Sequence, residues 1–238
     1  MQPINFRAQL SGAAYGRVAI PGDKSISHRA LLLGALAEGR THITGFLPGE
    51  DNLSTLKALT ACGVCITRTD QTTVAIQGVG LRGLKPASGP IDCGNSGTLM
   101  RLLSGILVGQ AFDSVLIGDE SLSKRPMKRI IDPLSKMGAH MVGTSDGTPP
   151  LKIQGNPHLH AITYQMPVAS AQVKSAILLA GLYAEGATTV IAPGISRDHT
   201  ERMLRAFQYP VDVFGLQTSL QGGGTLQGTS IKVPGDLS

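Results

Sequence analysis

Three stretches of the chain are apolar over almost their whole length and are long enough to form helices. They are "ALLLGALA" (30–37), "LLSGILVG" (102–109) and "AILLAGLYA" (176–184). A helix that is hydrophobic on every side belongs in the interior of a protein rather than on its surface. The pattern therefore predicts three buried helices packed against one another, with sheets outside them.

Each apolar stretch lies inside a longer segment that occurs three times, which indicates an internal repeat. In each copy, small polar residues and a basic residue open the helix, and a glycine and a β-branched strand follow it. The basic residues are Arg29, Arg101 and Lys174, which lie 72 and 73 positions apart. The segments are "KSISHRALLLGALAEGRTHITGF", "NSGTLMRLLSGILVGQAFDSVLIGD" and "ASAQVKSAILLAGLYAEGATTVIAP".

A second helix and two strands complete each copy. The helices are "EDNLSTLKALTACG", "SKRPMKRIIDPLSKMG" and "SRDHTERMLRAFQYP", and the strand pairs are "VCITRT…TTVAIQG", "AHMVGT…PPLKIQG" and "VDVFGLQTSL…GTSIKVPG". The sequence therefore predicts an α/β fold of three repeated βαβαββ units around buried parallel helices, an inside-out α/β barrel. The second helix ends at Gly63 and Gly138 in two copies, where glycine can take the left-handed conformation. The third copy has Gln208 instead, which the repeat does not explain.

Parallel packing of the three buried helices would bring their N-termini to one face. A helix N-terminus has unsatisfied N–H groups and about half a positive charge. Here each one also carries hydroxyl or amide side chains and a lysine or arginine. The sequence therefore predicts a receptor for a multiply charged anion.

The first helix start, "PGDKSISHR", offers Lys24, Ser25 and Arg29. Ser25 and Arg29 share a helix face because they lie four residues apart. Arginine can bind a phosphate or carboxylate through two N–H groups. The alternative is that Ser25 or Ser27 only caps the helix and that Arg29 is solvated. The segment is not a Walker loop, because Asp23 stands where its second glycine is required.

Two segments add polar groups near the second helix start. "DCGNSGTLMR" (92–101) has Asn95 and Gly97 in a glycine loop, where the backbone can approach a ligand closely. Taken alone, this segment is better explained by an ordinary N-cap. "SLSKRPMKR" (121–129) has Arg125 just before a predicted helix. Exposed basic runs are usually solvated, and Arg125 becomes a candidate only because the repeat symmetry brings this turn near the site.

The third helix start offers Ser170 and Gln172 in "VASAQVKSA", which can bind hydroxyl or phosphate groups, and Arg197 in "GISRDHTERM", which can close over an anion. Three neighbours in the last segment fit the charge pattern of a helix N-terminus better than a metal site or acid–base group: Asp198, His199 and Glu201.

Composition narrows the function further. The net charge of +5 comes without a basic run interleaved with aromatic residues, so it favours a small anionic substrate over nucleic acid. There is no apolar run of the roughly 18 residues that a membrane span needs, and no secretory signal. Three cysteines argue against a disulfide framework and for the reducing cytoplasm. Cys62, Cys65 and Cys93 are predicted to be buried structural residues.

Together these segments resemble the 5-enolpyruvylshikimate-3-phosphate synthase family over essentially the whole chain. The similar stretches are "PGDKSISHRALLLGALAEG", "GNSGTLMRLL", "RPMKRIIDPLSKMGA", "ASAQVKSAILLAGL" and "SRDHTERML". The sequences of the last two stretches, in "ASAQVKSA" and "SRDHTE", resemble the class that includes glyphosate-tolerant bacterial enzymes. The resemblance implies transfer of the enolpyruvyl group of phosphoenolpyruvate to the 5-hydroxyl of shikimate 3-phosphate, with release of phosphate, in the shikimate pathway of aromatic amino acid biosynthesis.

The resemblance also implies roles for individual residues. Lys24 would lie between the two substrates and, with Arg125, would act in catalysis. Phosphoenolpyruvate would lie against Gly97 and Arg125, with Asn95 nearby. Shikimate 3-phosphate would be held by Ser25, Arg29, Ser170, Ala171, Gln172 and Arg197. The family has a second serine at the position of Ala171, so here only the backbone of this residue would contribute.

The implied chemistry needs no metal or organic cofactor. Its acid–base groups would belong to the half of the enzyme that this chain lacks, and His28, which adjoins the site, would be a bystander. Gly97 leaves room where a methyl group would intrude on the phosphoenolpyruvate pocket, which favours sensitivity to glyphosate as an inhibitor. Two alternatives stay open: a non-catalytic domain that binds shikimate 3-phosphate, and the related UDP-N-acetylglucosamine enolpyruvyl transferase, whose lysine–asparagine pairing and reactive cysteine loop are not found.

Finally, the resemblance implies two domains, of which this chain would hold one. Residues 1–20 would belong with the absent second domain, residues 21–235 would form the substrate-binding domain, and residues 236–238 would begin the crossover to the absent C-terminal half. The Pro-Gly-Asp turns at 21–23 and 234–236 would form the hinge. On this interpretation the chain carries half of the active site and is inactive without its C-terminal partner.

Overall fold

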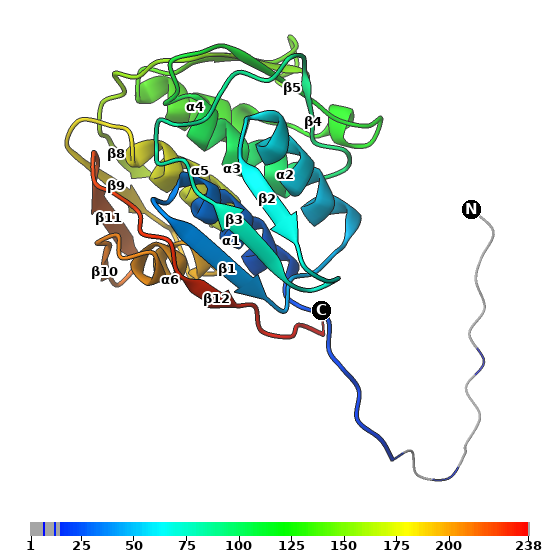
Figure 1. Ribbon diagram of the computed structural model, residues 1–238. Helices are drawn as coiled ribbons and strands as arrows, with labels where there is room; N and C mark the ends of the chain where they lie inside the picture. The colour runs from blue at the N-terminus through cyan, green and yellow to red at the C-terminus, as the bar shows by residue number, and fades with distance from the viewer. Residues whose placement is uncertain (1–6, 8–11, 13–14, 238) are drawn as a thin grey trace.

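The computed structural model describes residue 7, residue 12 and residues 15–237. Within this part, three four-stranded sheets lie around a bundle of buried helices, and α1, α3 and α5 run through the middle of the molecule (Figure 1). The predicted α/β class with three repeated units is confirmed. Over the residues described, no helix has both the length and the apolar character needed to cross a membrane.

The elements follow one order in each unit. The first unit contains α1 (Lys24–Leu36), β1 (Arg40–Thr44), α2 (Glu50–Ala61), β2 (Cys65–Arg68) and β3 (Val74–Gln77). The second contains β4 (Ile91–Asp92), α3 (Gly97–Leu107), β5 (Ser114–Ile117), the short 3₁₀ turn η1 (Leu122–Lys124), α4 (Lys128–Lys136), β6 (His140–Val142) and β7 (Leu151–Gln154). The third contains β8 (Thr163–Gln165), α5 (Ala171–Gly181), β9 (Ala187–Ile191), α6 (His199–Ala206), β10 (Asp212–Phe214) and β11 (Gln217–Gln221), and β12 (Ser230–Lys232) follows it.

The three sheets share one strand pattern. Their orders are β12-β1-β3-β2, β4-β5-β7-β6 and β8-β9-β11-β10. In each sheet the first two strands are parallel and the next two add in antiparallel fashion. The predicted βαβαββ order is therefore confirmed directly for the second and third units, in which the leading strand comes just before the buried helix.

The leading strand of the first sheet comes from the far end of the described chain. The sequence predicted that "GTSIKVPG" closes the third unit, and this is wrong, because β10 and β11 both lie within 211–221. Instead β12 pairs in parallel with β1, with Ile231 opposite Ile43. Residues 15–21 form no strand before α1, which leaves this edge of β1 open, and burial of Ile231 and Val233 there stabilises the pairing.

The two Pro-Gly-Asp turns lie side by side as a result. Gly22 forms an isolated antiparallel bridge with Gly235. The backbone N–H of Asp23 donates to the carbonyl oxygen of Pro234 at 2.9 Å. The first residues of the buried bundle are thus tied to the last residues of the first sheet, and the hinge role of these turns stays a prediction.

The predicted domain boundaries concern the two ends of the chain. Of the segment 1–20, residues 1–6, 8–11 and 13–14 lie outside the described residues, and residues 15–20 are exposed and form neither helix nor strand. Ser238 in the predicted crossover also lies outside them. The assignment of these segments to another domain stays a prediction.

The three central helices are parallel. Near their starts, Arg29 of α1 donates to the hydroxyl of Ser175 in α5 at 2.8 Å. Near their ends, Arg82 donates to the carbonyl oxygen of Gly109, just after α3, and lies over the ring of Tyr183, just after α5. Because starts meet starts and ends meet ends, all three N-termini face one side. The helices are buried over residues 27–36, 99–107 and 173–181.

The cysteines depart from prediction at one position. Cys62 and Cys93 are buried as expected. Burial raises the pKa of both thiols, that of Cys62 to about 11, so both stay protonated near neutral pH. The prediction for Cys65 is wrong: its side chain is exposed, because it begins β2, the outermost strand of the first sheet.

The second helix of every unit ends with the same backbone turn. Gly63, Gly138 and Gln208 follow α2, α4 and α6 with φ of 84°, 85° and 61°. In each case the next N–H donates back to a carbonyl five residues earlier, as when Tyr209 donates to Leu204 at 2.9 Å, which is a Schellman motif. Gln208 is therefore the repeat equivalent of the two glycines. The hydroxyl of Tyr209, which donates to the carbonyl oxygen of Gln221 at 2.6 Å, helps to hold this turn.

We expect Gln208→Gly to raise the free energy of unfolding by about 1 kcal/mol. A side chain in the left-handed region costs roughly 1–2 kcal/mol, which glycine would remove. Glycine also increases the conformational entropy of the unfolded chain, which offsets part of this gain in stability. Urea denaturation of the purified chain measures the change. The matched control is Gln165→Gly in β8, where the backbone is extended and glycine should lower stability. Equal losses in both variants would contradict the prediction.

Candidate anion-binding site at the helix N-termini

Each central helix begins with a side-chain cap. The predicted alternative that Ser25 or Ser27 caps α1 is wrong, because Asp23 does so and the Ser27 hydroxyl accepts from the N–H of Leu47. The caps leave the other N–H groups of each first turn directed at the same face. The cap contacts run from Ile26 N–H to Asp23 Oδ1 (2.6 Å), from Leu99 N–H to Ser96 Oγ (3.2 Å) and from Val173 N–H to Ser170 Oγ (3.4 Å).

Arg29 connects α1 to the third unit. Its Nε donates to Thr200 Oγ1 at 2.7 Å, and its Nη2 donates to Ser175 Oγ at 2.8 Å. Its Nη1 donates to the carbonyl oxygen of Ser25 at 3.0 Å. The residue is only 4% exposed, so Arg29 is a buried cation held by neutral oxygens, and the alternative of a solvated charge is wrong.

Arg101 of α3 is the repeat equivalent of Arg29 and is buried as well. Its Nη1 donates to Gln172 Oε1 at 2.7 Å, and the Gln172 amide nitrogen donates to Thr98 Oγ1 at 3.0 Å. Its Nε finds no partner among the described residues. The start of α5 is thus joined to the start of α3 through Gln172.

The loop before α4 carries Arg125 to the start of α3. Its Nη2 donates to Asn95 Oδ1 at 2.6 Å, and the Asn95 amide nitrogen donates to Asp119 Oδ2 at 2.7 Å. A Cβ atom on Gly97 would lie 3.2 Å from Arg125 Nη1 and 2.7 Å from Arg101 Nη1. The space above Gly97 is therefore bounded by two guanidinium groups.

Lys24 lies at the start of α1, where its Nζ is 3.1 Å from Asp51 of α2. Its side chain is 55% exposed, so it remains available to a ligand. Lys24, Ser25 and Arg197 line one cavity of about 390 Å³. Arg197 is exposed and precedes α6, and its charge acts on both Arg29 and His199.

Positive charge dominates this face, and the nearby carboxylates of Glu201 and Asp23 only partly oppose the lowering of the Arg29 pKa by burial. Burial lowers the pKa of Arg29 to about 10 and that of Arg101 to about 10, with further lowering of the latter by Arg129 and Arg125. Both guanidinium groups still carry their charge near neutral pH. Within the part of the chain that the structure describes, neither forms an ion pair. A buried cation without a carboxylate is costly, and an anionic ligand is the natural compensation.

The third repeat equivalent, Lys174, differs. It pairs with Glu201 of α6, and both side chains are buried. Glu201 lies in the first turn of α6, as the predicted charge pattern of a helix N-terminus requires, but its carboxylate is buried, whereas Asp198 pairs with Arg202 on the surface at 2.7 Å. The two neighbouring groups, Ser175 and Thr200, also contact each other, at 2.7 Å between their hydroxyl oxygens.

The predicted residues thus gather at one face. Hydrogen bonds of Arg29 and Gln172 join the starts of α1, α3 and α5 directly, and Ser170 and Ala171 are the N-cap and the first residue of α5. Four residues of this face were not predicted as site residues. They are Thr98, Arg101, Ser175 and Thr200. The repeat spacing of Arg101 could have indicated its place in the site, whereas single hydroxyl residues within a helix give no such indication in the sequence.

His28 is buried between three helices. Its Nδ1 lies 2.6 Å from Thr55 Oγ1 of α2, and its Nε2 lies 3.5 Å from Ser96 Oγ at the start of α3. Burial lowers its pKa to about 3, with Arg29 and Lys24 adding to the effect. The ring is therefore neutral, which fits a structural residue better than an acid or base.

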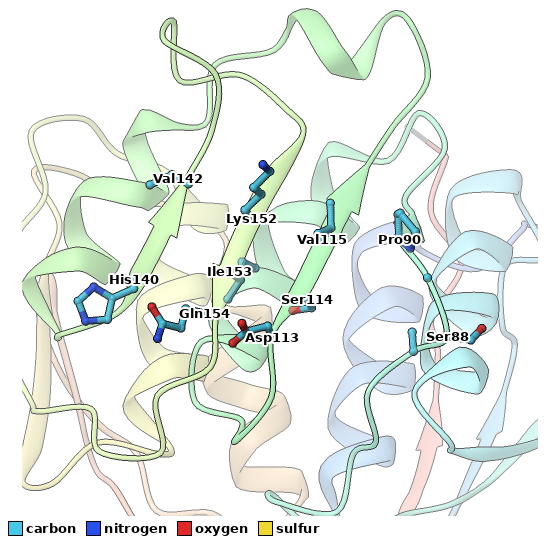
Figure 2. A pocket seen from close by; sticks show the side chains of 12 residues that line it. Ser88, Pro90, Asp113, Ser114, Val115, His140, Val142, Lys152, Ile153 and Gln154 are labelled. Carbon is cyan, nitrogen blue, oxygen red and sulfur yellow. The ribbon is translucent and has the colours of Figure 1, made fainter.

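Another cavity, of about 670 Å³, lies on the outward face of the second sheet. Figure 2 shows Ser88, His140 and Lys152 well apart around it. None of the predicted site residues lines it, and no helix N-terminus opens into it. Over the described residues, no group of His, Cys, Asp and Glu has an arrangement that could hold a metal ion.

Comparisons with known proteins agree with this arrangement. A family model described as EPSP synthase (3-phosphoshikimate 1-carboxyvinyltransferase) matches residues 9–238. The 3-phosphoshikimate 1-carboxyvinyltransferase of Alkalilimnicola ehrlichii is 57% identical over 235 residues, covering 99% of this chain and 53% of that protein. That of Nitrosococcus oceani is 54% identical over 246 residues, covering 100% of this chain and 55% of that protein.

The structural neighbours agree. An EPSP synthase from Acinetobacter baumannii superposes with a TM-score of 0.91 at 57% sequence identity. The match covers 93% of this chain and 50% of that chain. This chain therefore spans about half the length of the curated relatives it matches.

We expect His28→Asn to reduce the loss of stability on acidification. The folded-state pKa of about 3 lies below the ordinary value of 6.5, so between these values the unfolded chain binds a proton that the folded chain does not. Stability conferred by neutral His28 is thus lost as the pH falls below 6.5. From about pH 7 to about pH 5 the parent should lose about 2 kcal/mol more than the variant in urea denaturation. Parallel losses would contradict the burial of a neutral ring.

Proposed function

The chain belongs to the EPSP synthase family, and from this premise we propose that it supplies one half of the active site of a 3-phosphoshikimate 1-carboxyvinyltransferase. The enzyme transfers the enolpyruvyl group of phosphoenolpyruvate to the 5-hydroxyl of shikimate 3-phosphate and releases phosphate. The observation that carries the proposal is the pair of buried guanidinium groups, Arg29 and Arg101, that have no carboxylate partner in the described part of the chain and lie at the joined starts of three helices.

Shikimate 3-phosphate binds at the starts of α1 and α5 in this proposal. Arg29 and Arg197 supply charge, and the remaining groups are Ser25, Ser170, Gln172 and the backbone of Ala171. Phosphoenolpyruvate binds beside Gly97, between Asn95 and Arg125. Lys24 lies between the two ligands, where its flexible ammonium group can follow charge from one to the other.

The chemistry requires two anions to meet. The 5-hydroxyl loses its proton as its oxygen bonds to C2 of phosphoenolpyruvate, and C3 takes up a proton to give a tetrahedral adduct. That adduct then loses phosphate from C2 and a proton from C3. The cations at this face offset the repulsion between the two ligands and hold their reacting atoms close together. Such positioning and electrostatic stabilisation raise the rate of the reaction.

The proposal assigns the proton transfers to groups outside this face. His28 is buried and neutral, so the acid and the base come from the half of the enzyme that this chain does not cover. The chain alone therefore binds substrate without turnover. The matched family favours this reaction over that of the UDP-N-acetylglucosamine enzyme, and the proposal places the enzyme in the cytoplasm.

Calorimetric titration of shikimate 3-phosphate into the chain tests the proposal. Lys24→Met should weaken binding about tenfold or more, because a hydrogen bond to a charged group contributes about 1.5–3 kcal/mol. Lys152→Met removes the same charge from the outward face of β7 (Figure 2) and should leave the affinity unchanged.

The same titration separates the alternatives. Absence of binding by the parent would contradict a substrate site, and equal weakening by both variants would indicate only non-specific attraction. The parent should release no phosphate from the two substrates, and addition of the C-terminal half of the Acinetobacter baumannii enzyme should restore release. Binding without restored turnover would favour the non-catalytic alternative.

Glyphosate inhibition is the second expectation of the proposal. In the enzyme completed with that C-terminal half, Gly97→Ala should weaken inhibition about tenfold or more, since one methyl group in a close-fitting pocket changes binding by about 10–200-fold. The methyl group would enter the space between Arg101 and Arg125. The KM for shikimate 3-phosphate should stay nearly constant. Gly89→Ala, where a Cβ meets nothing within 4 Å, is the control, and unchanged inhibition by Gly97→Ala would contradict the assignment.

A further inference from the structure

Arg29 rests on two hydroxyl groups that the proposed chemistry does not use. Its Nε and Nη2, which point along one edge of the guanidinium plane, donate to Thr200 Oγ1 at 2.7 Å and to Ser175 Oγ at 2.8 Å. Thr200 is 2% exposed and Ser175 is 1% exposed. Neither residue is therefore open to the small ligand that we assign to this face.

The hydrogen bonds around Arg29 have one consistent direction. Ser175 Oγ donates to the carbonyl oxygen of Ala171 at 2.6 Å, so its proton is already used. Thr200 must then donate to Ser175 Oγ, from which it lies 2.7 Å. Both hydroxyl oxygens are left to accept from Arg29, and no rotation of either hydroxyl is free to change this. The guanidinium plane is consequently fixed along this edge.

Two N–H groups of Arg29 remain for a ligand. A guanidinium has five N–H groups, and Thr200, Ser175 and the carbonyl oxygen of Ser25 take three of them. One N–H remains on each terminal nitrogen. Two such groups side by side match two oxygens of a phosphate or a carboxylate.

Helix α6 is itself locked in place. Glu201, next to Thr200, pairs with Lys174, next to Ser175, and both charges are buried. Thr218 Oγ1 of β11 also donates to Glu201 Oε1 at 3.5 Å. An ion pair and a hydroxyl pair on consecutive residues therefore join α5 to α6, and a displacement of α6 that carries Thr200 away from Arg29 would also disturb a buried ion pair.

We propose that Thr200, supported by Ser175, is a positioning residue that orients the guanidinium of Arg29 for an anionic group of shikimate 3-phosphate. The inference rests on the proposed function for its ligand. It assigns to the third unit a task in binding that is performed without contact to the substrate. Without the Thr200 hydroxyl, the Nε group would be a buried unpaired donor and the side chain would turn to satisfy it.

Four variants test the proposal by calorimetry with shikimate 3-phosphate. Thr200→Val removes the hydroxyl at constant shape and should weaken binding about tenfold. Thr200→Ser keeps the hydroxyl and should bind like the parent. Thr188→Val is the matched control, because Thr188 is fully buried in the same unit and its hydroxyl has no partner among the described residues. Ser175→Ala, which removes the partner of Nη2, should weaken binding in the same direction and replaces Thr200→Val if that variant does not fold.

A second measurement does not depend on the substrate. The NMR signal of the Arg29 Nε–H group, identified by its loss in Arg29→Lys, should exchange slowly with water in the parent, Thr200→Ser and Thr188→Val. It should exchange at least about tenfold faster in Thr200→Val, because the hydrogen bond that protects it is gone. In the enzyme completed with the second half, Thr200→Val should raise the KM for shikimate 3-phosphate and leave that for phosphoenolpyruvate nearly unchanged.

The outcomes are distinguishable. Thr200→Val with the exchange rate and affinity of Thr188→Val would overturn the proposal, as would a Thr200→Ser variant as weak as Thr200→Val, since packing of the methyl group would then be the cause. A parent that binds no shikimate 3-phosphate would contradict the proposed function. The exchange rate would still decide, in that case, whether Thr200 fixes Arg29.

Discussion

The burial of positive charge at the joined starts of three parallel helices is the constraint on which this structure depends. Each helix start carries unsatisfied N–H groups and a partial positive charge, and Arg29 and Arg101 add full charges that are shielded from water. Neutral oxygens from Ser25, Ser175, Thr200 and Gln172 hold these groups in place without cancelling their charge. The fold thus keeps buried positive charge at this face, which in the proposed function a multiply charged anion offsets.

This arrangement needs all three units at once. Arg29 comes from the first unit and its hydroxyl partners come from the third, while Arg101 comes from the second and its amide partner comes from the third. The first unit also borrows its leading strand from residues 230–232. The site therefore requires the three units to be packed together, and a displacement of any one unit would change the hydrogen bonds at their shared face.

The repeat made much of this fold predictable, because periodic apolar residues and β-branched strands report local conformation directly. The prediction from the repeat was wrong where the conformation or pairing of a segment depends on residues distant in the sequence. The segment containing Ile231 has the pattern of a strand in either sheet, and only the open edge of β1 selects one. Gln208 takes the left-handed turn of Gly63 and Gly138 because its surroundings enforce it, although its residue type does not indicate it. Cys65 is exposed because its strand lies at a sheet edge.

By itself the sequence determined the three buried helices, the order of elements in each unit and the residues that open each helix, since all of these are written in short-range patterns. The tertiary structure decided which of the equivalent cations keep their charge uncompensated. Arg29, Arg101 and Lys174 occupy corresponding positions, yet among the residues described only Lys174 forms an ion pair, with Glu201. Such a contact joins residues on different helices, and its existence depends on how the helices pack, which no local pattern records.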